Sequence, residues 1–136
     1  MKTIFVDTSG FYALLIKRDN MHAKAKGILH KAKQLQTRFV TTDYILDETA
    51  TLLHARGLDH ILVNLFDVVF LSKACSVEWM NQDRFFSTRM YFQRYADHSY
   101  SFTDCFSFVI MKELDLANSL TKDDHFREAG FTPLLV

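Results

Sequence analysis

The feature that most constrains the fold is a regular alternation of short apolar runs with longer segments of helical spacing. Because strands that alternate with helices are joined by crossover connections, this pattern favours a parallel sheet covered on both faces. The expected strands are 3–6, 38–41, 74–78, 117–121 and 131–136, and the expected helices are 11–17, 22–35, 43–55, 59–71, 81–95, 104–114 and 124–129.

The size and charge of the chain limit its class. A chain of 136 residues is long enough for one domain with a buried core and too short for two, so we expect a single domain over residues 1–136. Basic and acidic residues number 16 each, which gives a net charge of zero. This balance counts against a protein that coats nucleic acid electrostatically. It does not exclude a nuclease, because a bound metal ion supplies positive charge at the site.

The expected location is the cytoplasm. Cys75 and Cys105 show neither CxxC nor Cys/His spacing, which indicates two reduced thiols. The apolar run before Asp7 has only three residues, so it is not typical of a signal peptide. The longest apolar stretch, 61–71, is interrupted by polar residues and is too short to cross a bilayer.

Two acidic residues stand at strand ends. Asp7 closes the expected strand 3–6, and Asp123 comes two residues after Thr121, at the end of the strand 117–121. Ligands of open parallel sheets bind beyond the carboxyl ends of the strands. If both strands are central, Asp7 and Asp123 should therefore share one edge of the sheet.

Two further acids lie near helix starts. Glu48 falls at the border of the apolar stripe of its helix and can reach inward, whereas Asp47 points to solvent. Asp104 opens a helix that is apolar nearly all round, so we expect it to be partly buried and stabilised by the helix dipole. Four acids that converge on one cleft repel each other. Mg²⁺ or Mn²⁺ would neutralise them and activate a water molecule.

Each acid also has a simpler interpretation when it is taken alone. Ser101 and Asp104 have the S-x-x-D spacing of a capping box. Asp123 could be a turn residue, with Asp124 capping the next helix. The metal hypothesis therefore depends on several acids falling at the strand exits of one sheet.

Four blocks of sequence carry a family resemblance, in order and over nearly the whole chain. The sequence resembles the PIN domain, and within that family the VapC-type toxin ribonucleases of type II toxin–antitoxin pairs. The blocks are Phe5-Val6-Asp7-Thr8-Ser9, Thr42-Asp43-Tyr44-Ile45-Leu46-Asp47-Glu48-Thr49, Ser101-Phe102-Thr103-Asp104, and Leu120-Thr121-Lys122-Asp123-Asp124-His125-Phe126 followed by Ala129-Gly130-Phe131.

The resemblance implies a fold, an activity and a site. The fold is an α/β/α sandwich with a central, mainly parallel sheet, and the activity is Mg²⁺- or Mn²⁺-dependent hydrolysis of RNA. Members of the family often form homodimers and are held inactive by a small antitoxin. The implied catalytic and metal-binding acids are Asp7, Glu48, Asp104 and Asp123, and the implied supporting residues are Thr8, Ser9, Thr121 and Asp124.

Two other functions stay open. Haloacid-dehalogenase-like phosphohydrolases place D-x-D after the first strand, and Ser9 at the third position argues against that class. A non-catalytic PIN domain that binds RNA or protein would typically lose acids, whereas this chain keeps all four.

Several features carry no assigned function. The aromatic residues of 81–95 could stack on RNA, but we expect them to be core, with solvated arginines between them. The apolar helix within 59–71 could be a dimer surface, an antitoxin surface or core. The six histidines show no ligand spacing, and a structural role is expected for His125 beside Asp123.

Overall fold

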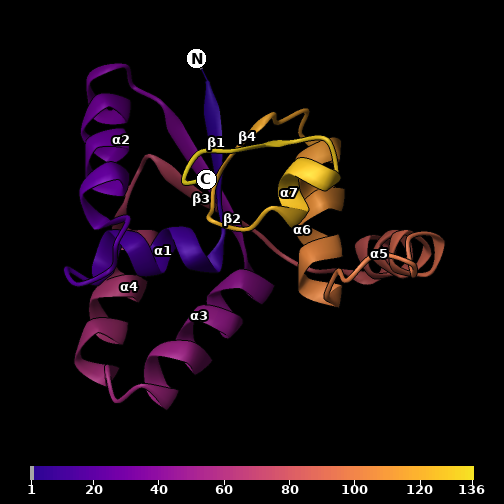
Figure 1. Cartoon of the computed structure of the whole chain (residues 1–136), viewed down its shortest axis with the longest axis horizontal. Helices are drawn as coiled ribbons and strands as arrows, with labels where there is room; N and C mark the ends of the chain where they lie inside the picture. The colour runs from indigo at the N-terminus through magenta and orange to yellow at the C-terminus, as the bar shows by residue number, and fades with distance from the viewer. Residues whose placement is uncertain (1) are drawn as a thin grey trace.

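The centre of the molecule is a five-stranded, all-parallel sheet. The computed structural model describes residues 2–136 (Figure 1), so Met1, part of the expected 1–136 domain, lies outside the described residues. The strand order is β3-β2-β1-β4-β5, and every neighbouring pair is parallel. The strands are β1 (Thr3–Val6), β2 (Arg38–Thr42), β3 (Cys75–Glu78), β4 (Asn118–Leu120) and β5 (Thr132–Pro133).

Helices cover both faces of this sheet, which confirms the predicted three-layer α/β/α sandwich. In Figure 1, α1 to α4 lie on one side of the strands, and α6 and α7 on the other, with α5 packed outside α6. The helices are α1 (Thr8–Leu15), α2 (His22–Gln34), α3 (Asp43–Ala55), α4 (Asp59–Leu71), α5 (Gln82–Arg94), α6 (Phe102–Glu113) and α7 (His125–Glu128).

The sheet is apolar because both of its faces are covered. Phe5 and Val6 on the central strand are buried, and the ring of Phe5 packs against that of Phe126 from α7. Such a strand reads as a continuous apolar run, since no side faces water. Gly10 lets α1 lie close to β4, because a Cβ there would collide with the backbone carbonyl of Leu120.

The sequence located the elements well and their ends less well. The last strand is shorter than the expected 131–136 and covers only Thr132–Pro133. Beyond it the backbone of Leu134 and Leu135 still donates hydrogen bonds to Ser119 and Thr121. The first helix begins earlier than expected, at Thr8, because Asp7 in extended conformation serves as its N-cap residue.

The expected core role of the α5 aromatics is wrong for three of them. Phe85, Phe86 and Phe92 are 43%, 48% and 40% exposed, and among the helix residues only Thr88 is buried. The expected solvation of the arginines is also wrong at Arg84, which pairs with Glu113 and Glu78. Helical periodicity alone does not reveal that this helix packs on another helix at the periphery and not on the sheet.

Helix α4 is only partly core. Leu65 and Val69 are buried, whereas Val68, Phe70 and Leu71 are more than half exposed. The interpretation that this segment belongs to the core therefore holds for one side of α4. The other side leaves an exposed apolar surface. Among the described residues, none of the helices combines the length and the apolar character needed to cross a bilayer.

Candidate active site

The carboxyl ends of β1 and β4 lie side by side and bring together residues far apart in the sequence. Val6 is in register with Leu120, so Asp7 and Thr121 follow their strands at the same edge. Asp7 is only 6% exposed, and its Oδ2 accepts a hydrogen bond of 2.8 Å from the Thr121 hydroxyl. We predicted that Asp7 and Asp123 share one edge of the sheet if both of their strands are central. β1 and β4 are adjacent and have neighbours on both sides, so this condition is met.

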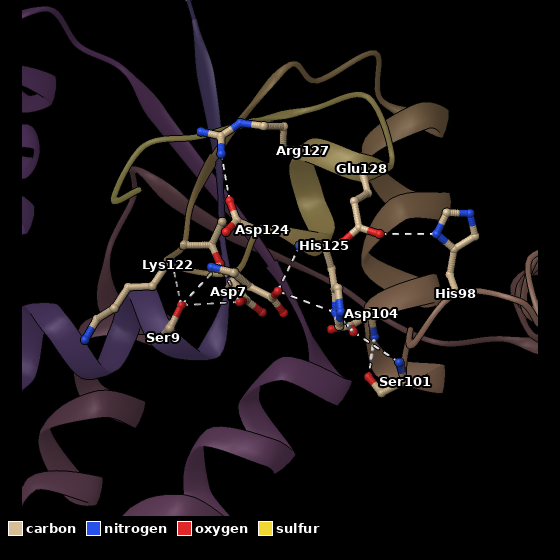
Figure 2. Close-up of polar contacts among 12 residues, drawn as sticks. Asp7, Ser9, His98, Ser101, Asp104, Lys122, Asp124, His125, Arg127 and Glu128 are labelled. Carbon is tan, nitrogen blue, oxygen red and sulfur yellow. Dashed lines mark hydrogen bonds and ion pairs between the residues drawn. The ribbon is translucent and has the colours of Figure 1, made fainter.

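A chain of hydrogen bonds fixes the loop around Asp7. The backbone N–H of Asp123 donates to Thr121 Oγ1 at 3.0 Å, and the N–H of Lys122 donates to Ser9 Oγ at 2.9 Å. The hydroxyls of Ser9 and Thr121 are 3.1 Å apart. Because the Thr121 proton points to Asp7, Ser9 is the donor between them. Figure 2 shows Asp7 and Ser9 close to the backbone of Lys122.

Asp104 and Asp123 approach each other across the same end of the sheet. Ligand atoms of Asp104, Asp123 and His125 all lie within 4.8 Å of one another. Asp104 stands at the third position of α6, where the predicted capping box with Ser101 is present. A cap does not exclude a ligand role, since only one oxygen accepts from Ser101 and the carboxylate has further lone pairs.

Asp7 and Glu48 stand outside that compact group. Glu48 was expected to reach inward from α3; the residue is exposed, but its Oε1 accepts a hydrogen bond of 2.6 Å from Thr8. Its neighbour Asp47 is exposed, as predicted. The bond from Thr8, which directly follows Asp7, holds Glu48 beside the same strand end.

Burial and neighbouring carboxylates raise the pKa values of two acids at this edge, Asp7 and Asp104. Burial raises the pKa of Asp7 to about 7 and outweighs the hydrogen bonds from the Thr121 side chain and the Thr8 backbone, which lower it; Asp104 and Glu48 add smaller increases. Burial also raises the pKa of Asp104, and Asp123 adds to the effect. A carboxylate cluster with such pKa values favours either bound protons or a bound cation.

His125 belongs to this edge, although only a structural role was expected for it. Its Nδ1 is 3.2 Å from Asp104 Oδ2 and 3.4 Å from Asp123 Oδ1. Burial lowers its pKa, but the charges of Asp123 and Asp104 outweigh burial and raise it above the usual value. In the sequence, the position of His125 two residues after Asp123 indicated that it lies near the site. Its contact with Asp104 depends on the tertiary structure.

Asp124 lies apart from the carboxylate group. It is exposed and pairs with Arg127 at 2.7 Å, as Figure 2 shows. Asp124 occupies the N-cap position of the last helix, as the alternative interpretation expected, but its side chain makes no capping hydrogen bond. Instead Asp123 Oδ1 accepts from the backbone N–H of His125 at 2.9 Å, so Asp123 does act as a turn residue.

Comparisons with known proteins identify the family of the chain. The chain is 31% identical over 128 residues to the 23S rRNA-specific endonuclease VapC20 of Mycobacterium tuberculosis, in strains CDC 1551 / Oshkosh and H37Rv, covering 94% of this chain and 95% of the relative. The crystal structure of Mycobacterium tuberculosis VapC20, described as a Sarcin-Ricin loop cleaving toxin, superposes with a TM-score of 0.85 at 30% identity, covering 95% of this chain and 96% of that one. The sequence profile of the PIN domain matches residues 4–132. The chain belongs to the PIN domain family.

Proposed function

We propose that this chain is a metal-dependent endoribonuclease, in which residues 1–136 act as one domain. The observation that carries the proposal is the buried Asp7 at the end of the central strand, at an edge that also holds Asp104 and Asp123. The endonuclease relatives support cleavage of an RNA phosphodiester. Because those relatives are specific for 23S rRNA, ribosomal RNA is the first substrate to test.

The donor set fits Mg²⁺ or Mn²⁺. Both ions take carboxylate oxygens and keep water positions free for a phosphate. Asp7, Glu48, Asp104 and Asp123 would hold the metal. The pKa of Asp7, raised by burial and by neighbouring carboxylates, supports a site that needs a cation at neutral pH. A bound divalent ion supplies Lewis acidity, lowers the pKa of water and neutralises charge on the phosphate.

The residues around the acids would position them. Thr121 directs one oxygen of Asp7, Thr8 directs one oxygen of Glu48, and the backbone of Ser101 directs Asp104. Each hydrogen bond leaves lone pairs free on the carboxylate that it orients. Ser9 supports the site through Thr121. The proposed supporting role of Asp124 is indirect, through the loop that it shares with Asp123.

We also propose that the protein is a cytoplasmic toxin held inactive by a small antitoxin, and that it forms a homodimer. Two separate exposed apolar surfaces support partners of this kind. One is on α4, where Leu71 is 78% exposed, and the other on α5, where Met90 is 71% exposed. Light scattering of the purified chain should give twice the chain mass, and the mass of one chain would contradict the homodimer.

The decisive experiment is cleavage of ribosomal and total cellular RNA by the purified, antitoxin-free protein. Reactions with Mg²⁺, with Mn²⁺ and with EDTA would run beside Asp7→Asn and beside Asp47→Asn, an exposed acid on α3 that serves as a matched control. We expect metal-dependent cutting by the native chain and by Asp47→Asn, and none by Asp7→Asn. Full activity in a folded Asp7→Asn variant would contradict the site. An absence of cutting by folded protein under every metal would favour the non-catalytic binding module.

A further inference from the structure

One member of the compact group at the sheet edge is not an acid. The imidazole of His125 is directed at Asp104, as Figure 2 shows, and its Nδ1 lies 3.2 Å from Asp104 Oδ2. The same nitrogen lies 3.4 Å from Asp123 Oδ1. The PIN-domain resemblance assigned four acids to the metal and no histidine.

The distances from His125 to the two carboxylates suit ligands that share one cation. Bonds of about 2.1 Å, typical of Mg²⁺–oxygen and Zn²⁺–nitrogen contacts, place ligand atoms about 3.0 Å apart at right angles and about 3.4 Å apart at tetrahedral angles. The two distances from His125 Nδ1 fall in this range. A cation could therefore lie between the imidazole and either carboxylate with little movement of that pair, and the ligand atoms of all three residues lie within 4.8 Å of one another.

The fold holds the ring in this position. The backbone N–H of His125 donates to Asp123 Oδ1 at 2.9 Å, so ring and carboxylate belong to one turn. The buried Tyr100 packs edge-to-face on the imidazole with ring centroids 5.4 Å apart. Tyr100 in turn stacks on His98 at 4.7 Å. These contacts already restrict the His125 side chain, so metal binding costs little further conformational entropy.

We infer that His125 supplies a nitrogen ligand to the metal held by Asp104 and Asp123, and that this ligand shifts the preference of the site from Mg²⁺ toward Mn²⁺. The chemical reason is that imidazole suits transition ions, whereas Mg²⁺ prefers oxygen and keeps its water. The inference rests on the proposed metal-dependent function and deepens it, because it concerns which ion that site selects.

The test uses Mn²⁺ itself as the probe, with the full chain and two variants. His125→Asn keeps an amide near the position of Nδ1, so a hydrogen bond to Asp104 can persist while the imidazole nitrogen is lost. His54→Asn is the matched control, since His54 is an exposed histidine that pairs with Asp59 at the far end of α3 from the acids. Pulsed electron paramagnetic resonance detects nitrogen coupled to bound Mn²⁺, and the free-Mn²⁺ signal under Mg²⁺ competition gives both affinities.

We expect nitrogen coupling in the native chain and in His54→Asn, and none in His125→Asn. The Mn²⁺ affinity of His125→Asn should fall at least tenfold, while its Mg²⁺ affinity changes less than about threefold. Nitrogen coupling that persists in His125→Asn would overturn the inference, and so would equal losses for both ions. Native protein that binds both ions without nitrogen coupling would overturn the inference alone. Native protein that binds neither ion would overturn the proposed function as well.

Discussion

The hydroxyl of Thr121 donates a 2.8 Å hydrogen bond to Oδ2 of Asp7, across 114 positions of sequence. This bond ties the carboxyl ends of two adjacent parallel strands together at the point where the candidate site lies. It also opposes the effect of burial on Asp7, because a hydrogen bond to the carboxylate favours its charged form.

Replacing Thr121 with valine should weaken the site, because valine removes the hydroxyl that binds Asp7 and accepts from the backbone N–H of Asp123. The Thr121→Val variant loses the donor to Asp7, so the pKa of Asp7 should rise further and protons should compete better with metal near neutral pH. We expect Mn²⁺ affinity at pH 7 to fall about tenfold and the rising limb of the cleavage profile to move to higher pH. A profile with an unchanged midpoint would refute this role.

The control for that variant is Thr88→Val on α5. Thr88 is equally buried, and its hydroxyl donates to the backbone oxygen of Arg84, far from the acids in the sequence. Both variants bury a methyl in place of a hydroxyl, and Thr121→Val should cost more stability because its hydroxyl also accepts from the backbone N–H of Asp123. Only Thr121→Val should alter the pH dependence of metal binding.

The stability of the metal-free protein should fall as pH rises toward 8. Asp7 has a pKa of about 7 in the folded state against an ordinary value of 3.8, so the folded state binds more protons between these two values. Ionisation of Asp7 does not lower the free energy of unfolding below about pH 4, and it lowers it by the full amount above about pH 7. The full amount is on the order of 4 kcal/mol, because each unit of pKa difference corresponds to about 1.4 kcal/mol.

Asp7→Asn should remove most of this pH dependence. Urea unfolding at pH 5 and pH 8, without metal, measures the difference directly. At pH 8 the variant should be more stable than the native chain, and at pH 5 the gap should shrink. Added Mn²⁺ should raise the melting temperature of the native chain far more than that of the variant. If the free energy of unfolding changed equally with pH in both proteins, the pH dependence would not come from the buried carboxylate of Asp7.

Gly10→Ala should destabilise the fold. A Cβ at this position meets the Leu120 carbonyl, so α1 must move away from β4, at a cost of about 1–3 kcal/mol. Gly27→Ala on α2 is the control. A Cβ at Gly27 would have nothing within 4 Å, and alanine in a helix interior should add about 0.5–1 kcal/mol. The two free energies of unfolding should therefore change in opposite directions, and changes of the same sign would contradict the close approach.

Asp19→Asn should loosen the loop that carries Asp123. Asp19 accepts from Lys122 Nζ at 2.7 Å and from the backbone of Met21 at 2.8 Å. Burial alone would raise the pKa of Asp19, but these bonds and the charge of Lys122 outweigh it and lower the pKa. The pair therefore stabilises the protein above the unfolded pKa and is lost as pH falls through the folded pKa.

The expected loss for Asp19→Asn is about 1 kcal/mol at pH 7, because Lys122 is partly exposed and solvent screens the pair. Denaturant unfolding at pH 7 and at pH 3 measures it. The native chain and the variant should differ at pH 7 and converge at the acid end. A difference that stays constant with pH would show that the charge of Asp19 does not matter.

The sequence by itself determined the alternation of strands and helices, and with it the parallel sheet. It also placed Asp7 after a strand and Asp104 in a capping box, because these depend on periodicity and on contacts three residues apart. Local spacing is enough for such features. The predictions therefore lie close to the observed elements for the strands 3–6 and 38–41 and for the helix 104–114.

Only the tertiary structure decided what the strand ends bring together. The pairing of β1 with β4 places Thr121 on Asp7, and the packing of α7 against α6, where Phe126 contacts Phe108, brings His125 to Asp104. The exposure of Phe86 depends on where α5 packs, which periodicity does not contain. These relationships join residues far apart in the chain, so their physical cause is strand order and helix packing, not local preference.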